Sequence, residues 1–481
     1  MEMLSVSVLS DDQIERIHSA SLAILLETGV EVPHPDLLGR FADAGASVDI
    51  SARRVRIPPD LVERCLASAG RSFTLYGRDP ARQAAFGRGR RNYNSIAGEA
   101  LWVDEPSGAR RYAALPDVVT AARLGDALDG ITIVGVMADP HDLPADWRCV
   151  AVFAALLKNT TKPVTFWYHD RASARFINEI MITLRGDEAG AAQFPVCYPF
   201  LEPISPLRFP FDGVDLLYET ARLNLPVPIG PMAQMGMSAP ATLAGTMAQE
   251  NAEILAGICI TQLIRPGMPV CYGGICHAFD MRTTQMIFAG PEQAIFGVAM
   301  TQMGKRYGLP VYINVGLTDA KRPDAQAGLE AGVTLAFGAA AGADIFGHMG
   351  ISGVDQAASA DMLVFQNEAI RYVESVLRNV DFSDDALAVE EVAAVGPGGT
   401  FINREHTVEH FRRELWQPRL LDRRFYEAWR ESGAADMEKR CRELRAEICE
   451  SHRPEPMDEM LAREIDSIVE SARRELGRDR T

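Results

Sequence analysis

The sequence PVCYPF at residues 195–200 is the first of five short apolar runs that share one pattern. Four of the five runs end in a glycine or a polar or aromatic residue, and a stretch long enough for a helix follows most of them. A run of this length without polar alternation is typical of a strand buried on both faces. The other runs are PVPIG at 226–230, PVCYGG at 269–274, PVYINV at 310–315 and ADIFGH at 343–348.

Alternation of strands and helices at this spacing predicts parallel strands joined by helical crossovers. ITIVGVM at 131–137 and the run at 163–167 precede the five runs, so seven units are apparent. The segment Arg91–Ile96 is a candidate for the eighth strand. We therefore predict an α/β fold built on a TIM (β/α)8-type barrel, with an N-terminal α/β extension and a C-terminal helical extension.

The sequence predicts three regions. Residues 1–112 form the N-terminal extension, which begins with a helix capped at Ser10 and includes a strand at Leu101–Asp104 that pairs back. Residues 113–380 form the catalytic barrel. Residues 381–481 form the C-terminal extension, which is charged but expected to pack on the rest of the chain. Its apolar residues include Trp416, Leu420, Tyr426 and Trp429.

Composition narrows the partners and the compartment. The chain has 481 residues, of which 47% are hydrophobic, and a net charge of −17 that argues against nucleic acid or an anionic membrane. Its eight cysteines are scattered without a CxxC pair, which is typical of reduced thiols. The chain begins without a signal-peptide pattern and has no run of 18 apolar residues. We expect a cytoplasmic protein that does not insert in a membrane.

Polar and aromatic residues gather at the ends of the predicted strands, where a barrel of this type carries its active site. We take His348, Asp280 and Asp319 as candidate catalytic residues, and no residue is assigned to a metal. Aromatic faces attract quaternary ammonium groups through cation–π interactions, so we expect two or three aromatic side chains to face the barrel mouth. The candidate substrate-binding residues are Tyr93, Trp167, Tyr198, Phe200, Glu202, Gln234, His277, Tyr312 and Phe346.

Other motifs are weaker. Gly396–Gly399 (GPGG) has no lysine after it, so we interpret it as a turn and not a phosphate loop. Asp139-Pro140-His141 resembles the start of D-x-H-x-x-G, a motif of corrinoid-carrying domains, but Pro144 stands where the glycine belongs. A zinc site of Cys271, Cys276 and His277 is less favoured than structural thiols, because consecutive strand residues point to opposite faces.

The chain also resembles the trimethylamine methyltransferase family over nearly its whole length, in particular the members without pyrrolysine. The resemblance lies in collinear blocks along the chain. These are LETGV at 26–30, SFTLYGRDP at 72–80, KNTTKP at 158–163, ISPLRF at 204–209, APATLAG at 239–245, FDMR at 279–282, GLTDAK at 316–321, DAQAG at 324–328, GH at 347–348, VGPGG at 395–399 and EHT at 405–407.

The resemblance implies a corrinoid-dependent methyltransferase with a barrel fold. Family members that use pyrrolysine act on trimethylamine, whereas this chain has Gly350, Ser352, Gly353 and Asp355 in the corresponding region. It therefore implies a small quaternary amine such as glycine betaine or a related betaine. The acceptor would be cob(I)alamin on a separate corrinoid protein, with cobalamin as its cofactor and none attached covalently to this chain.

A quaternary nitrogen already carries the charge that makes a neutral amine the leaving group, so the protein needs to position one methyl group and exclude water. The aromatic residues would hold the ammonium, and His348 with a neighbouring donor would hold a substrate carboxylate. Two alternatives stay open: a zinc-thiolate methyltransferase with another methyl donor, and a barrel that binds betaine without catalysis. The small-residue helix Ala327–Ala341 indicates close packing, and we expect a homo-oligomer.

Overall fold

A parallel sheet of five strands forms half of the barrel in the computed structural model, which describes residues 4–105 and 107–477. Its neighbours pair in register, for example Tyr272 with Val311 and Tyr312 with Ile345. All five strands are buried, as the unbroken apolar runs predict. In order they are β11 (Val227–Ile229), β13 (Val270–Gly274), β16 (Val311–Asn314), β17 (Ile345–Met349) and β6 (Asn92–Ser95).

Three further segments close the barrel. β9 (Val134–Gly135) is the next strand around the barrel after β6, because Asn94 of β6 forms a parallel bridge with Ile133. On its other side β9 pairs in parallel with β10 (Val164–Thr165). The amide of Val164 donates to the carbonyl of Val196 at 2.9 Å. Leu201, at the other end of the same extended segment, bridges Ile229 of β11. The predicted TIM-type barrel is therefore confirmed.

The strand β6 supplies the barrel position for which Arg91–Ile96 was the candidate, because it pairs in parallel with β17. This strand lies before residue 113, so one barrel strand belongs to the region predicted as the N-terminal extension. The division at residues 112 and 380 stays a prediction. The extended segment 196–201 takes the position predicted for the first apolar run, and its residue Leu201 forms a bridge with β11.

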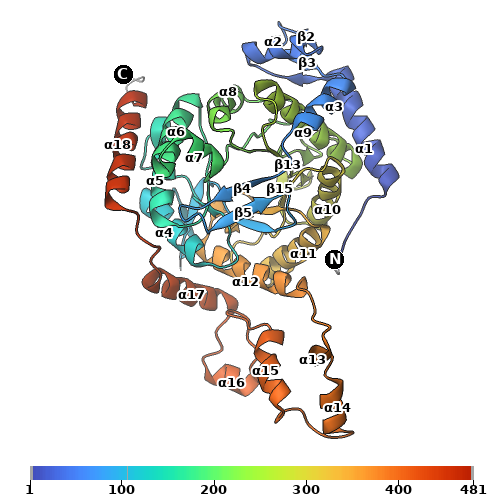
Figure 1. Cartoon of the computed structure of the whole chain (residues 1–481), viewed down its shortest axis with the longest axis vertical. Coiled ribbons are helices and arrows are strands. Elements are labelled where there is room, and N and C mark those ends of the chain that lie inside the picture. Colours follow the sequence, from blue (N-terminus) through green and yellow to red (C-terminus); the bar gives the residue numbers. More distant parts are fainter. Residues whose placement is uncertain (1–3, 106, 478–481) are drawn as a thin grey trace.

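Helices surround the strands as an outer layer (Figure 1). Aliphatic side chains of the inner helix faces pack on the outward side chains of the strands, which makes one continuous core. The helices of this layer are α4 (Leu115–Ala127), α5 (Ala145–Asn159), α6 (Arg171–Arg185), α7 (Glu188–Gln193), α8 (Phe211–Thr220), the 3-10 turn η2 (Ala221–Leu223), α9 (Leu243–Ile264), α10 (Pro291–Arg306), α11 (Ala325–Ala341) and α12 (Ala360–Val376).

A hairpin from the N-terminal region closes the barrel end at which the strands begin. β4 (Phe73–Tyr76) and β5 (Gln83–Phe86) cross the barrel axis in Figure 1, and the rings of Phe73 and Phe86 stack at 4.3 Å. Their apolar side chains form one cluster with residues of the barrel interior, including Ile345. The barrel is therefore filled at this end, and a substrate has to enter at the opposite end.

The rest of the N-terminal region packs beside the barrel. α1 (Asp11–Ala23) begins at Ser10, whose side chain and that of Gln13 form the predicted capping box. The strand predicted at Leu101–Asp104, β7, does not pair with β6: it pairs with β8 (Ala109–Arg111) and with β19 (Ala357–Ala358). The remaining elements are the π-helical turn η1 (Ile24–Thr28), β1 (Val30–Glu31), α2 (Pro35–Asp43), β2 (Ser47–Asp49), β3 (Arg54–Arg56) and α3 (Pro59–Ser68).

Two small sheets follow the barrel strands and form a rim around the mouth. One is the sheet of β7, β8 and β19, which is completed by β18 (Ile351–Ser352) just after β17. The other contains β12 (Gln234–Met235), β14 (His277–Asp280) and β15 (Gln285–Ile287). Because β12 and β14 follow β11 and β13 along the chain, both sheets extend the barrel on its carboxyl side.

The C-terminal region has two parts. α17 (Met437–Ser451) packs on α12, and α18 (Glu459–Leu476) packs on α5 and α6, so these helices continue the outer layer (Figure 1). The preceding segment, with α13 (Asp384–Leu387), α14 (Val389–Val395), α15 (Glu405–Glu414) and α16 (Tyr426–Glu431), projects away from the barrel. The prediction that this region packs is therefore right for Trp416 and Leu420 and wrong for Tyr426, which is 63% exposed. None of the described helices is long and apolar enough to cross a membrane.

Candidate active site

An aromatic wall lines one side of the barrel interior near the carboxyl ends of the strands. The rings of Trp167 and Phe200 meet edge to face at 5.8 Å, and those of Phe200 and Tyr312 at 5.5 Å. Tyr198, two residues before Phe200 in the same extended segment, is 2% exposed and belongs to the apolar cluster that includes the β4–β5 hairpin. Three of the predicted aromatic residues thus come together, and Tyr198 lies beneath them.

Glycine backbone holds these rings in place. A Cβ atom on Gly98 would lie 2.9 Å from the Trp167 indole, and one on Gly347 would lie 1.9 Å from the Tyr312 hydroxyl. The indole nitrogen of Trp167 also donates to the carbonyl of Gly98 at 3.1 Å. Any larger residue at either glycine would displace the ring that packs on it, so the backbone itself fixes the geometry of the wall.

Polar side chains without partners face the same interior. Three buried polar atoms have no hydrogen-bond partner among the described residues: Nδ1 of His348, Oδ1 of Asn94 and Oδ1 of Asn314. The amide nitrogen of Asn94 reaches the Tyr312 hydroxyl at 3.4 Å, and the His348 ring lies 6.2 Å from the Tyr312 ring. Buried polar atoms in proteins are nearly always paired, so these atoms mark a place where a ligand supplies the missing partner.

Both histidines of this region are neutral at ordinary pH. Burial lowers the pKa of His348 to about 4, because the charged imidazolium loses its hydration there. Burial, with a smaller contribution from His348, lowers the pKa of His277 to about 3. His277 stacks on Phe288 at 4.4 Å and its Nε2 lies 3.4 Å from the amide of Asn314. A neutral imidazole keeps one N–H donor, which can hold an anionic oxygen.

Three carboxyl groups meet at the mouth, just beyond β6, Leu201 and β17. Burial, followed by the Asp355 carboxyl, raises the pKa of Glu202 to about 7. Burial also raises the pKa values of Glu99 and Asp355, whose side chains are hydrogen-bonded to each other. Two carboxyl groups this close repel each other when both are ionised, which adds to the effect of burial. In the described residues no arginine, lysine or histidine forms an ion pair with any of the three.

Buried carboxylates on α9 hold the loops of the mouth. Glu250 accepts hydrogen bonds from the amides of Ala233 and Ile275, at 3.1 and 2.8 Å. Glu253 accepts the Ser205 hydroxyl and the Leu207 amide, at 2.6 and 2.8 Å. These loops follow Leu201, β11 and β13, so α9 fixes the loops that carry Glu202, Gln234 and His277.

Two predicted substrate-binding residues lie outside the barrel interior. Tyr93 on β6 and Phe346 on β17 stack on each other at 5.0 Å, and the Tyr93 hydroxyl donates to Glu374 of α12. Adjacent strand residues point to opposite faces, and these two face the helical layer. They do not belong to the aromatic wall, and we no longer assign them to substrate binding.

The predicted acids Asp280 and Asp319 have structural partners. Asp280 is the last residue of β14, where the exposed Arg282 donates to it at 3.0 Å and lowers its pKa to about 2. Asp319 accepts the amide of Phe288 at 2.9 Å and so ties β15 to the loop after β16. Gln234 lies in β12, half-buried, beside His277 in the rim sheet. The roles of these residues stay predictions.

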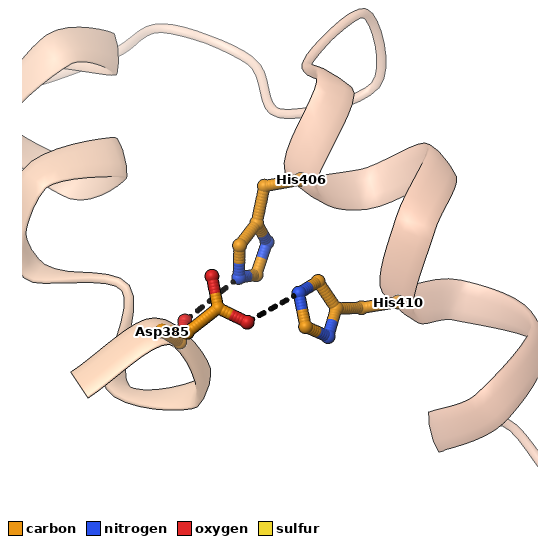
Figure 2. Close-up of side chains that lie close together, drawn as sticks. All are labelled: Asp385, His406 and His410. Carbon is orange, nitrogen blue, oxygen red and sulfur yellow. Dashed lines mark hydrogen bonds and ion pairs between the residues drawn. The ribbon is translucent and has the colours of Figure 1, made fainter. Parts of the chain in front are cut away.

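The cysteines do not assemble a zinc site. Cys271 packs in the apolar cluster inside the barrel, whereas Cys276 belongs to the core outside it. Burial raises the pKa values of both thiols well above the ordinary range, so neither is a ready thiolate. Among the described residues, one group has ligand atoms close enough for a metal, and it lies on the projecting segment: Asp385, His406 and His410 (Figure 2). The carboxylate of Asp385 lies 3.1 Å from His410.

Sequence reasoning missed Asn94, Glu99 and Asn314. Asn94 stands in the run NYNS, where an inward polar residue in a buried strand is itself a signal. Glu99 follows β6 by four residues, but β6 was not placed firmly enough in the barrel for the rule used for the other strands to be applied there. Asn314 lies inside the run PVYINV, so a rule that selects residues just after each run passed over it.

The fold and the site together define a (β/α)8 barrel with an aromatic wall and unpaired polar atoms near the carboxyl ends of its strands. The model of the trimethylamine methyltransferase family matches residues 2–477, so the chain belongs to that family of methyltransferases.

Relatives and solved structures agree with this assignment. The chain is 29% identical to a trimethylamine methyltransferase of Desulfitobacterium hafniense, over 99% of this chain and 96% of that one. It is also 29% identical to a glycine betaine methyltransferase of another strain of that species, over 98% of both chains. In fold it is similar to a monomethylamine methyltransferase in its hydroxylamine complex, with a TM-score of 0.54, 10% identity and coverage of 98% of this chain and 88% of that one.

Proposed function

We propose that this protein transfers a methyl group from a small quaternary amine, glycine betaine or a related betaine, to the cob(I)alamin of a separate corrinoid protein. The observation that carries the proposal is the combination of the aromatic wall of Trp167, Phe200 and Tyr312 with three carboxyl groups that have no counter-cation. A quaternary ammonium satisfies both, since it binds to aromatic faces and needs no hydrogen-bond acceptor. The relative named glycine betaine methyltransferase supports the same substrate class.

Charge balance supports a cation at the mouth. Burial and their mutual contact raise the pKa of Glu99, burial raises that of Asp355, and Glu202 adds negative charge as the pH rises through its pKa of about 7. A bound cation offsets the cost of burying this charge, because opposite charges attract strongly where water is excluded. The carboxylate of a betaine would point to the interior, where the unpaired, neutral imidazole of His348 is the available donor.

The residues of the barrel interior position the substrate and do not react with it covalently. The two thiols of β13 and its following loop are buried and protonated, and the imidazoles of His277 and His348 are neutral. The corrinoid of the partner protein supplies the nucleophile when it docks over the mouth. This chain would hold one methyl group toward the opening, exclude water and release a neutral amine, which requires no proton.

The test uses the purified protein, chemically reduced cobalamin and a panel of methylated amines, with methylcobalamin followed by its absorbance. We expect methylcobalamin to form with a quaternary amine and not with trimethylamine. Formation with trimethylamine alone would overturn the substrate class. Tight betaine binding without methyl transfer to free cobalamin or to a corrinoid protein would favour the non-catalytic barrel, and transfer that depends on added zinc would favour a zinc-thiolate enzyme.

A further inference from the structure

The projecting segment has no core of its own. We call residues 381–431, which carry α13 to α16, the arm. None of the residues in these four helices is buried. Helices of this length are unstable in water without packing, since isolated helices shorter than about 12–15 residues are marginal. The ion pair of Arg404 with Glu391 is a surface contact that contributes little.

The arm exposes large apolar side chains. Phe425 is 92% exposed, Ile402 82% and Phe382 67%. Isolated apolar residues on a surface are ordinary, but the arm carries them in every helix and in the loops between. A segment of defined helices with its apolar side chains in solvent is typical of one half of an interface.

A second apolar surface lies on the barrel next to the root of the arm. The groove between α11 and α12 has a volume of about 960 Å³ and is lined by Leu329, Val333, Tyr372 and Val376. Leu329 is 68% exposed and Val376 61%. The arm leaves the barrel after α12 and its four helices extend away from it (Figure 1). Of the arm only Leu421, near the end at which the chain returns to the barrel, is among the residues that line the groove.

We propose that the arm of one copy packs into the α11–α12 groove of a second copy. A two-fold axis makes the exchange reciprocal, so each copy covers the groove of the other and both apolar surfaces are buried at once. With about 150–250 Å² for each aromatic side chain, the exposed parts of the arm approach the about 800 Å² per partner that a stable interface buries. Surfaces this apolar suit a permanent homodimer, whereas a corrinoid protein has to bind and leave.

The first test is the oligomeric state of the full chain by analytical ultracentrifugation at micromolar concentration. We expect a dimer or a higher assembly built from it. Leu329→Asp in the groove and Ile402→Asp on the arm should each shift the protein to a monomer. The matched control is Ile50→Asp, which charges an apolar residue that is 77% exposed in the turn between β2 and β3 and should leave the dimer intact. All three positions are exposed, and circular dichroism should show that each variant is folded.

Mixing the two interface variants tests the reciprocal arrangement. The Leu329→Asp copy has an intact arm and the Ile402→Asp copy an intact groove, so the mixture should recover dimers that neither variant forms alone. No recovery, with both variants folded, would overturn the contact between arm and groove. A monomeric wild-type protein would overturn the proposal too, and so would a dimer that survives both substitutions. A monomeric wild-type protein that binds a corrinoid protein through the groove would assign the groove to that partner.

Discussion

The rings of Tyr312 and His348 meet inside the barrel at 6.2 Å and an angle of 69°, from the neighbouring strands β16 and β17. The pairing of β17 with β6 shifts between Phe346 and Met349, just where His348 lies. This shift changes the strict alternation of the strand, so His348 faces the interior although Phe346, two residues earlier, faces α12. The aromatic wall and the unpaired imidazole are thereby brought to one place.

The aromatic wall predicts a selective effect on substrate affinity. Phe200→Leu keeps an apolar side chain but removes the aromatic face between Trp167 and Tyr312. A cation–π contact contributes about 0.5–2 kcal/mol, so KM for the quaternary amine should rise about 2- to 30-fold, with a smaller change in kcat. The matched control is Phe346→Leu, which lies outside the interior and should leave KM unchanged. Steady-state kinetics with cobalamin measures both, and equal effects on KM would contradict the placement of the wall.

Glu202 predicts a pH dependence of binding. Its pKa of about 7 in the free protein means that its ionised fraction rises from about a tenth at pH 6 to about nine tenths at pH 8. A cation prefers the ionised form, so KM should fall as the pH rises through 7. Glu202→Gln should flatten this profile. A profile that stays steep in Glu202→Gln would assign the titration to another group, the pair of Glu99 and Asp355 being the first candidate.

His348 predicts how stability responds to acid. Its folded pKa of about 4 lies below the ordinary value of 6.5, so the unfolded chain binds the proton more readily between these values. The free energy of unfolding should therefore decrease as the pH falls from about 6.5 toward 4, by at most about 1.4 kcal/mol per pH unit for this one group. Urea unfolding at pH 7, 6 and 5 should show a shallower decline for His348→Gln. Parallel curves for the two proteins would show that this histidine is not held neutral by the fold.

Glu250 predicts a coupling between α9 and the mouth. The two carboxylate oxygens of Glu250 accept one backbone amide each, from Ala233 and Ile275. Glu250→Gln keeps only one acceptor oxygen, so one of these buried amides loses its partner. The expected loss in the free energy of unfolding is about 1–3 kcal/mol, together with a higher KM because the loop carrying His277 moves. Urea unfolding and kinetics measure the two effects, and a rescue of stability by excess substrate would link them.

Asp280 predicts an almost silent substitution. Asp280 ends β14, and its side chain is bonded to that of Arg282, which is 89% exposed. Asp280→Asn should change kcat/KM less than about twofold and the free energy of unfolding by about 0.5 kcal/mol or less, as is usual for surface positions. A loss of activity greater than tenfold in a folded protein would restore the catalytic role predicted from the sequence.

The sequence by itself determined the barrel, because strands buried on both faces have unbroken apolar sequences. The spacing between these runs leaves room for one helix after most of them. It also determined the family and the edge of the sheet at which the site lies. His348, Trp167, Phe200 and Tyr312 were found in this way, since each stands near the carboxyl end of a predicted strand. Local pattern carries this information because burial and strand direction are properties of single segments.

The tertiary structure alone decided which of these side chains meet. Tyr93 and Phe346 satisfy the same sequence rule as Tyr312 but face α12, because the face of a strand depends on its register with its neighbours. Glu99, Glu202 and Asp355 are far apart in the sequence, and their pKa values rise because burial brings them together without a cation. The arm, likewise, has an amphipathic sequence that any packed helix could have. Its exposure follows from where the chain goes after α12, and that is a property of the whole fold.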